Sequence, residues 1–374
     1  MADHLALAAA LPALHILAPA MPAMPAMPAM PAASVAAGAD VSLAFLIATI
    51  LVALAFDFTN GFHDTANAVA TSISTRVLTP RVAIVMAAAL NFLGAFISTS
   101  VAKTIGTDVA VRTALTPLAV MAALLAAIGW NLLTWYYGLP SSSSHALIGG
   151  IIGAAVVVSP QHFGALKGGG ILTIVLSLVL SPVIGLIVAY GIGIALLWIF
   201  RRMNPQDVTG LAQWLQRISA AFVAFSHGSN DAQKTMGIIT AAILTYEGVP
   251  LSANFSVPIW VILASATAMA LGTTFGGWRI IKTMGMRIMK MRPIDGFAAQ
   301  TAAASVIFTA SHLGLPVSTT HVIAGSVMGV GARQRLSAVR WGVAGDMVVA
   351  WLLTGPITAV LAAIITFILL GLHL

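Results

Sequence analysis

The chain has 374 residues, of which 59% are hydrophobic and only 7% are charged. Soluble domains carry roughly 25% charged residues, so this composition excludes a water-soluble globule and predicts a protein whose solvent is lipid. The net charge of +7 does not indicate nucleic-acid binding, because the basic residues lie in short gaps between apolar runs and form no patch with aromatic residues. With no cysteine in the sequence, disulfides and thiolate metal sites are also excluded.

Residues 1–40 differ in composition from the rest of the chain. The triplet Met-Pro-Ala repeats from Met21 to Pro31. Proline at every third position is incompatible with a regular helix, so we predict a disordered, low-complexity arm. A cleaved signal peptide is a poor interpretation, because Asp3 and His4 stand where such a signal carries Lys or Arg.

Long apolar stretches follow one another through the remainder of the sequence. They cover residues 41–75, 82–102, 116–137, 140–158, 171–200, 218–246, 257–278, 294–311, 314–332 and 341–372. A helix that crosses a membrane needs about 20 residues. Several stretches are longer and contain Gly, Pro or Asn near their middles, which is typical of a span joined to a half-helix. We therefore predict an all-α, polytopic membrane protein with about 10–12 transmembrane or half-membrane helices.

Two motifs occur twice. The run Gly138-Leu-Pro-Ser-Ser-Ser-Ser-His-Ala-Leu-Ile-Gly returns as Gly314-Leu-Pro-Val-Ser-Thr-Thr-His-Val-Ile-Ala-Gly, offset by 176 positions (314 minus 138). The run Phe58-Thr-Asn-Gly-Phe-His-Asp-Thr-Ala-Asn returns as Phe225-Ser-His-Gly-Ser-Asn-Asp-Ala-Gln-Lys, offset by 167 (225 minus 58). The chain therefore contains an internal repeat.

Each half of the chain holds five apolar stretches in the same order. An odd number of crossings per half gives the two halves opposite orientations, which is the inverted-repeat plan of secondary transporters. We predict a first inverted repeat at 41–202, a cytoplasmic linker at 203–217 and a second repeat at 218–374, each repeat with a helical hairpin. Most of the 17 basic residues fall in the gaps on one side of the membrane. That side is predicted to be cytoplasmic, with both termini outside a cytoplasmic (inner) membrane.

The Pro-Ser/Thr motif indicates an anion site. Pro140 and Pro316 stand where helices can begin, and a helix start presents free backbone N–H groups and a positive dipole end. The hydroxyls that follow can wrap a tetrahedral oxyanion, although a single such run is explained as well by helix capping. Two copies in opposed halves favour the anion site. The candidate phosphate-binding residues of this motif are Ser142, Ser143, Ser144, Ser318, Thr319 and Thr320, with His145 and His321 one turn later as relay or supporting residues.

Asp64 and Asp231 lie deep in apolar stretches, where an ionised carboxylate costs about 2.5–3.5 kcal/mol even on the lenient insertion scale. Polar residues cluster around them in the sequence: Asn67, Asn230, Gln233 and Lys234. Lys234 could simply pair with Asp231, whereas Asp64 has no local partner. Two unit charges of like sign at 4 Å repel by about 4 kcal/mol at an effective dielectric of 20. A bound cation or proton removes that repulsion, so anion binding beside these acids predicts ion coupling. Asp57 and Asp346 have no repeated context and are interpreted as structural.

At these residues the chain resembles the PiT family of inorganic phosphate transporters, and in particular its bacterial Pit-type members. The resemblance rests on Asn60-Gly-Phe-His-Asp-Thr-Ala-Asn-Ala, on Phe225 to Lys234 and on the two Pro-Ser/Thr motifs, and it extends over 41–372. It implies phosphate held between two helical hairpins, cation-coupled uptake and a homodimer. By the same resemblance, Asp64 and Asp231 hold phosphate or its coupling cation together with Asn67 and Asn230.

One departure bears on the coupling ion. The common family pattern is Gly-Ala-Asn-Asp in both halves, but the first half here reads Gly61-Phe-His63-Asp64. His63 replaces an amide that sodium-coupled relatives could use as a ligand, and Pit-type relatives that share this histidine resemble proton symporters carrying metal-phosphate complexes. We therefore expect phosphate symport with protons, with His63 among the coupling residues and no resident cofactor or metal.

Other interpretations stay open at this point. The coupling cation could be sodium, a divalent metal could travel with phosphate, and the anion could be another tetrahedral oxyanion such as sulfate or arsenate. An intramembrane enzyme built on Ser141 and His145 is a weaker hypothesis, because one active site does not require a doubled motif. A phosphate sensor without flux is a third possibility, against which the acidic pair favours a carrier.

Overall fold

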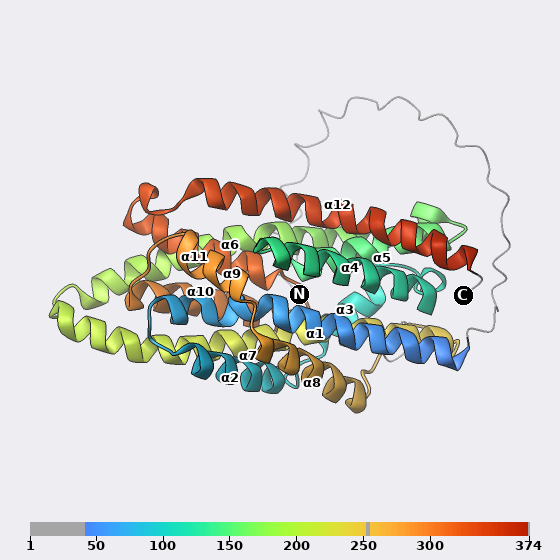
Figure 1. Cartoon of the computed structure of the whole chain (residues 1–374), viewed down its shortest axis with the longest axis horizontal. Coiled ribbons are helices and arrows are strands. Elements are labelled where there is room, and N and C mark those ends of the chain that lie inside the picture. Colours follow the sequence, from blue (N-terminus) through green and yellow to red (C-terminus); the bar gives the residue numbers. More distant parts are fainter. Residues whose placement is uncertain (1–41, 252–254, 373–374) are drawn as a thin grey trace, which may run out of the picture. The chain divides into compact units, whose positions relative to one another are not determined.

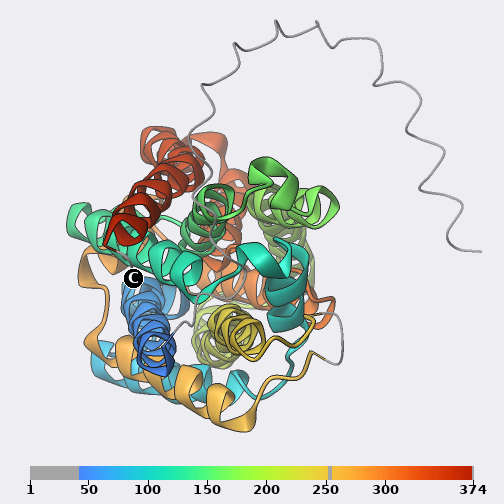
Figure 2. The same cartoon turned by 90° about the vertical axis from the view of Figure 1, so that its right-hand side faces the viewer.

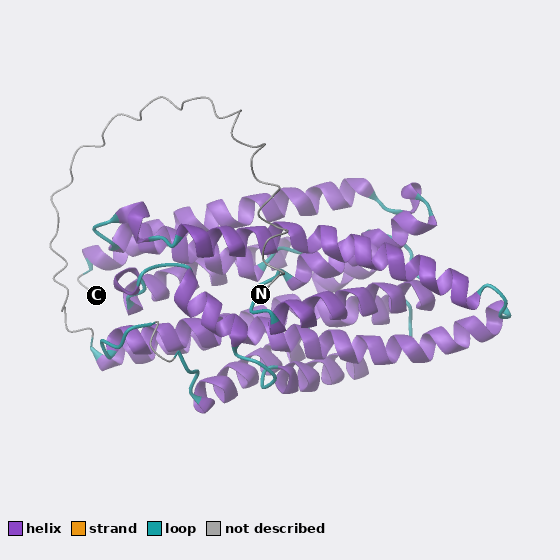
Figure 3. Cartoon of the chain, turned by 180° about the vertical axis from the view of Figure 1, so that it is seen from behind, coloured by secondary structure: helices purple, strands orange, loops and turns teal. Residues whose placement is uncertain are grey.

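The computed structural model describes residues 42–251 and 255–372. In these ranges the regular structure is helical apart from a single bridge between Ala110 and Leu166 (Figure 3). The predicted arm at 1–40 lies outside the described residues. The helices of the first half are α1 (Leu43–Ser74), α2 (Pro80–Gly94), α3 (Ser100–Asp108), α4 (Pro117–Tyr137), α5 (Ser143–Val158) and α6 (Gly168–Phe200). Those of the second half are α7 (Pro205–Tyr246), α8 (Ile259–Phe275), α9 (Trp278–Lys282), α10 (Pro293–His312), α11 (Thr319–Gln334) and α12 (Trp341–Gly371).

Each predicted apolar stretch contains a helix, but the stretch 82–102 is not one element. Helix α2 ends at Gly94 and α3 begins at Ser100. Between them the Ser98 hydroxyl oxygen accepts a hydrogen bond from the Ser100 backbone N–H at 3.1 Å, and the Ser98 hydroxyl donates to the Ser100 hydroxyl. Serine side chains that bond to nearby backbone groups compete with the helix ladder, so the chain leaves the helix at this point.

Four helices within the described ranges are long and apolar enough to cross a membrane: α1, α4, α6 and α12. A fifth candidate is α8 followed by α9 and a π-helical turn, and this pair is bent by 64°. The bend lies at Gly276, whose φ of 64° is in the region that glycine adopts without strain. Large apolar side chains of α6 and α12 are exposed on the chain's surface, as expected for helices that face lipid.

Helix α7 is longer than the sequence predicted. Residues 203–217 were expected to be a linker, but from Pro205 onward they form the first turns of a helix that continues to Tyr246. Asn204 caps this helix by accepting a hydrogen bond from the Gln206 N–H, and Pro205 occupies its first position, where proline is favoured. The connection between the halves is therefore short.

The close packing of helices repeats between the two halves. A Cβ on Gly61 of α1 would lie 2.2 Å from a backbone oxygen of α8, and one on Gly228 of α7 would lie 2.1 Å from a backbone oxygen of α2. These glycines are 167 positions apart (228 minus 61). Gly149 of α5 meets α12 in the same way, at 2.3 Å, and Gly325 of α11 meets α6 at 2.1 Å. Each half thus packs its motif helices with helices of the other half.

Figures 1 and 2 show this packing between the two halves. Helices α1 and α7 lie side by side, with α2 and α8 along their outer edge. Helix α5 lies against α12, whereas α11 lies against α6. The motif segments of α1, α5, α7 and α11 are buried in this arrangement, and the doubled motifs are brought together there.

Candidate functional site

The starts of α5 and α11 have the same capped geometry. The Ser142 hydroxyl oxygen accepts a hydrogen bond from the His145 backbone N–H at 3.2 Å, and the Ser318 hydroxyl oxygen accepts one from His321 at 3.3 Å. These two residues are N-caps, which is the bond that serine commonly makes at a helix start. The capping interpretation of the motif therefore holds for Ser142 and Ser318. The hydroxyls that follow them in the sequence make other contacts.

The two helix starts meet. The Ser144 hydroxyl donates to the Val317 carbonyl at 3.4 Å, immediately before the start of α11. The Lys234 ammonium bonds to both of these groups, at 2.5 Å from Ser144 Oγ and 3.2 Å from the Val317 oxygen. Elements that are 176 positions apart in sequence are therefore held at one place by a side chain of α7.

Two buried carboxylates face these helix starts from α1 and α7. Asp64 is 2% exposed and Asp231 is fully buried. The Ser143 hydroxyl donates to Asp64 Oδ2 at 3.2 Å, and the Thr319 hydroxyl donates to Asp231 Oδ2, also at 3.2 Å. The two contacts are equivalent in the repeat, since both the acids and the hydroxyls keep their sequence offsets. We call Asp64, Asp231, Ser143 and Thr319 the acid–hydroxyl cage.

Asn67 and Lys234 occupy equivalent positions, 167 residues apart (234 minus 67), but differ in charge. The Asn67 amide donates to Thr320 Oγ1 at 3.0 Å, and the Lys234 ammonium donates to Ser144 Oγ, which is the equivalent atom of the other half. Lys234 also lies 2.5 Å from Asp231 Oδ1. The second half of the site therefore contains a fixed positive charge where the first half has a neutral amide.

His63 and Asn230 form another equivalent pair (230 minus 63 is again 167). His63 Nε2 lies 3.1 Å from the Thr134 hydroxyl of α4, and the Asn230 amide donates to the Ser311 hydroxyl of α10 at 3.0 Å. On its other side, His63 Nδ1 lies 2.6 Å from Asp64 Oδ1. The histidine is therefore bonded directly to one acid of the cage.

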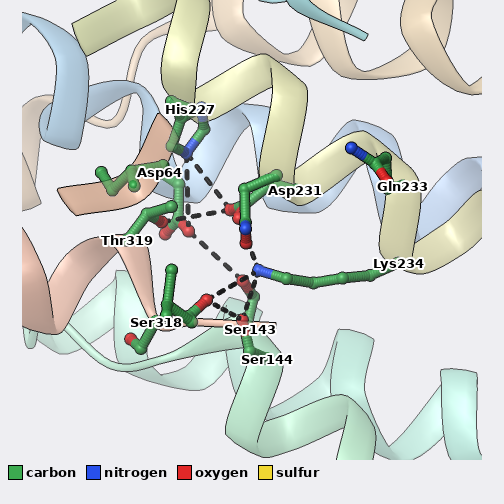
Figure 4. A network of polar contacts seen from close by, with 12 residues as sticks. Asp64, Ser143, Ser144, His227, Asp231, Gln233, Lys234, Ser318 and Thr319 are labelled. Carbon is green, nitrogen blue, oxygen red and sulfur yellow. Dashed lines mark hydrogen bonds and ion pairs between the residues drawn. The ribbon is translucent and has the colours of Figure 1, made fainter. Parts of the chain in front are cut away.

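His227 is a site residue that the sequence analysis missed. Its Nε2 lies 3.3 Å from Asp231 Oδ2 and 4.0 Å from Asp64 Oδ2, so one ring bridges the two acids (Figure 4). Its Nδ1 lies 3.2 Å from the Asn91 amide oxygen, which can only accept a hydrogen bond. Since Nε2 faces carboxylates, the geometry favours a proton on both ring nitrogens. The sequence contains one signal for this residue: His227 stands four residues before Asp231, and this spacing places both on one helix face.

Asp64, His227 and Asp231 each offer one ligand atom, and these atoms lie within 4.8 Å of one another. Carboxylate oxygen and imidazole nitrogen are common ligands of divalent metals. In the protein the two carboxylates already bond to other groups: Asp64 to Ser143, and Asp231 to Thr319 and Lys234. The group can thus exchange protein donors for a cation, which suits reversible binding better than a permanent metal centre.

Residues 60–362 match the phosphate transporter family. The chain belongs to this family. It is 49% identical over 332 residues to a probable low-affinity inorganic phosphate transporter of Bacillus subtilis, covering 88% of this chain and 98% of the relative. It is 47% identical over 331 residues to a protein of the same description from Rhizobium meliloti, with the same coverage.

A solved structure entitled "The sodium-dependent phosphate transporter" is similar to the whole fold. The TM-score is 0.81 at 26% identity, and the match covers 89% of this chain and 100% of that one. Together with the spanning helices, membership of the phosphate transporter family makes the chain a multi-pass membrane protein and confirms the all-α, polytopic prediction.

The enzyme hypothesis is wrong, because the family and its relatives are transporters. The local geometry agrees with this outcome. The Ser141 hydroxyl bonds to Thr134 at 2.8 Å and lies 3.4 Å from His63 Nε2, so its histidine neighbour comes from α1. His145 instead stacks on His321, with ring centroids 4.7 Å apart.

Three further predicted residues lie beside the acid–hydroxyl cage. His145 and His321 stack one turn behind the two helix starts, and His321 also stacks on Trp351 at 4.0 Å, so their observed contacts are those of supporting residues. The Gln233 side chain accepts from the Val101 N–H at 2.9 Å and holds the start of α3. In Figure 4 it lies outside the network of dashed contacts that joins the acids.

Proposed function

We propose that this phosphate transporter family protein carries inorganic phosphate across the cytoplasmic membrane together with protons, as a secondary-active symporter. The observation that carries the proposal is the acid–hydroxyl cage, in which two helix starts and two buried acids converge from both halves of the chain. The names of the relatives, which are described as probable low-affinity inorganic phosphate transporters, support phosphate as the substrate.

The phosphate-binding groups in this proposal are the hydroxyls of Ser143, Ser144, Thr319 and Thr320, with the ammonium of Lys234 as the cationic partner. Ser142 and Ser318 contribute by capping the two helices, whose free N–H groups and dipoles favour an anion. A Lys ammonium binds phosphate as a point charge and without the bidentate grip of arginine. That suits a carrier, which must release its substrate as well as bind it.

The cage also supplies a physical reason for coupling. A hydroxyl has one hydrogen to donate, and those of Ser143 and Thr319 are now given to Asp64 and Asp231. When these hydroxyls turn to phosphate, each carboxylate loses a hydrogen bond while an anion approaches it. Protons or cations must then compensate both losses, so phosphate and its coupling ions bind together.

His63 is the residue that favours protons as these ions. When its Nε2 carries a proton it can donate to Thr134 Oγ1, whose own hydrogen is directed to the Trp130 carbonyl at 2.9 Å. When Nε2 is bare it can accept from the Ser141 hydroxyl at 3.4 Å. Both protonation states of the ring thus have partners, and Nδ1 holds Asp64 in each. Such a group can take up and release a proton without leaving an orphaned atom.

Sodium coupling is the second candidate, and one observation favours it. The side-chain oxygens of Asn67 and Asn230 have no hydrogen-bond partner within the described ranges, and amide oxygens are suitable ligands for a small cation. The structural neighbour is also entitled sodium-dependent. Against it, Asp231 is already occupied by Lys234 and His227.

We further propose that the two halves are inverted repeats, with both termini outside, and that the protein acts as a homodimer. These features rest on the doubled motifs, the distribution of basic residues and the family resemblance. A divalent metal could also enter with phosphate as a neutral complex; to bind at Asp64, His227 and Asp231 it would have to displace the Nε2 proton of His227 and the contacts that Asp231 now makes. Arsenate has the same tetrahedral shape and is expected to compete with phosphate, whereas sulfate lacks the proton that a carboxylate can accept.

The test is uptake of radiolabelled phosphate into proteoliposomes that contain the purified protein. We expect an inward proton gradient to drive accumulation without sodium, and a protonophore to abolish it. Under a gradient of one pH unit, accumulation by His63→Asn is expected to fall by about tenfold, since one coupled proton fewer removes about 1.4 kcal/mol of driving force. Uptake that requires a sodium gradient and ignores the protonophore would establish the second candidate instead.

A further inference from the structure

The other aspartate of α1, Asp57, is also buried but takes no part in the cage. Asp57 is 0% exposed and lies seven residues before Asp64, or about 10 Å along the helix axis. Because its context is not repeated, the sequence predicts a structural role for it. Its counterpart in the second half, 167 positions on, is Ala224. Asp57 is therefore a feature of one half only.

The bonding of Asp57 differs from that of the other buried acids. Its Oδ1 accepts a hydrogen bond from the Thr235 hydroxyl of α7 at 2.6 Å, while its Oδ2 has no partner within residues 42–251 and 255–372. In the same part of the chain, Asp64, Asp231 and Asp295 each form an ion pair, and Asp57 forms none. An ionised carboxylate with a single hydrogen bond and no counter-charge is strongly disfavoured in such surroundings.

The neighbours of Asp57 accommodate a neutral carboxyl group. The Ser265 hydroxyl of α8 faces it and, like Asp57 Oδ2, has no hydrogen-bond partner among the described residues. The Ser265 hydroxyl can accept the O–H of a protonated carboxyl and can donate its own O–H to an ionised one, so it offers Asp57 a partner in both protonation states. The charged groups that act on Asp57 are Asp231 and Lys234 of α7, with Asp64 two turns along its own helix.

We propose that Asp57 is a proton-binding site of the transport cycle, separate from His63 and from the acid–hydroxyl cage. This inference rests on the proposed proton-coupled function. The proton enters from water as Asp57 Oδ2 forms its O–H bond, and it leaves to water on the opposite side as that bond breaks. Thr235, which holds the other oxygen, directly follows Lys234 in α7.

This position connects the proton to the cage. When Asp57 is neutral, the Lys234 ammonium is held by Asp231, Ser144 and the Val317 carbonyl, as observed. Loss of the proton creates a second negative charge that competes with Asp231 for Lys234. The pull on the ammonium weakens the positive charge offered to phosphate, so proton release and phosphate release favour one another.

The first test is infrared difference spectroscopy of the purified protein in detergent, which requires no transport. A protonated carboxyl has a C=O stretch well separated from the carboxylate bands. We expect this band at neutral pH in the wild type and its loss in Asp57→Asn. The control is Asp346→Asn, which removes an exposed aspartate of α12 and should leave the band unchanged. A spectrum without the band in the wild type, or with the band retained in Asp57→Asn, would overturn the proposal.

The second test counts protons per phosphate in proteoliposomes with the membrane potential clamped. We expect Asp57→Asn to carry one proton fewer, so that its maximal accumulation under a gradient of one pH unit falls about tenfold. Asp57→Glu, which keeps the acid, and Asp346→Asn should match the wild type. An unchanged stoichiometry in Asp57→Asn would refute the assignment of Asp57, whereas a wild type that ignores the proton gradient would refute the proposed function as well.

Discussion

The two halves of the site share their geometry and differ in their charges. The Ser143–Asp64 contact of the first half and the Thr319–Asp231 contact of the second are both 3.2 Å long. At the position where the first half has Asn67, the second has Lys234, and the latter lies 2.5 Å from the acid of its own half. The comparison teaches that the repeat gives both halves the same acid–hydroxyl contact, while the substituted positions give the two halves different charges.

The histidines are exchanged between the halves in the same way. His63 in the first half corresponds to Asn230 in the second, and Asn60 in the first corresponds to His227 in the second, each at an offset of 167. Each half therefore contributes one imidazole, yet both rings contact Asp64: His63 at 2.6 Å and His227 at 4.0 Å. The charge pattern around the cage is asymmetric although the positions that produce it are symmetric.

The largest effect is expected when either acid of the cage is neutralised. Removing one partner of a buried charged pair typically costs about 3–5 kcal/mol, so Asp231→Asn, which leaves Lys234 and His227 without their acid, should reduce uptake by at least about a hundredfold. Asp64→Asn leaves only histidine unpaired and should be less damaging to the folded yield. Uptake in a phosphate-transport-deficient host measures both, with Asp346→Asn as the control. Undiminished uptake in both variants would remove these residues from the account.

A smaller effect is expected when the halves are made alike in charge. Lys234→Asn copies the first half into the second and removes the fixed positive charge, so phosphate affinity should fall by about tenfold, the cost of one charge-assisted hydrogen bond. The vacated position should then accept a cation, and uptake should become stimulated by sodium. Lys234→Arg keeps the charge and serves as the control. Uptake by Lys234→Asn that matches the wild type with or without sodium would contradict this assignment.

The smallest effects should separate the capping serines from the donor hydroxyls. Ser142→Ala and Ser318→Ala each remove an N-cap, which costs about 1 kcal/mol, and should lower the thermal midpoint in detergent. Ser143→Ala and Thr319→Val instead remove a donor to the acids and should weaken phosphate binding with little change in stability. Calorimetric titration with phosphate, beside thermal unfolding of the same samples, distinguishes the two classes. Equal loss of affinity in all four would show that capping and binding are not separable.

The sequence predicts the features that arise within one helix turn and the motifs that occur in both halves. The helix starts at 143 and 319 follow from the hydroxyl residues, whose capping chemistry acts within one turn, but Pro140 and Pro316 lie before these starts and not in the first turn as predicted. The buried acids follow from their cost in an apolar stretch. Their convergence follows from the repeat itself. The family resemblance contributed the ligand roles of the amides and the significance of His63.

The missed features depend on contacts between distant segments. His227 matters because Asp64 of the other half lies on its far side, and Gln233 is drawn out of the site because α3 offers it backbone N–H groups. Ser141 bonds toward His63 of α1 although His145 is closer in the sequence. No pattern of spacing along one helix encodes these partners, because each is chosen by packing against another element.

The most direct measurement of the central claim is an experimental structure with arsenate, whose arsenic atom gives an anomalous X-ray signal. We predict a single peak between the starts of α5 and α11, with the hydroxyls of Ser143 and Thr319 turned from the carboxylates toward the anion. Soaking with phosphate should displace the peak. An arsenic peak elsewhere, with both hydroxyls still bonded to Asp64 and Asp231, would contradict the account.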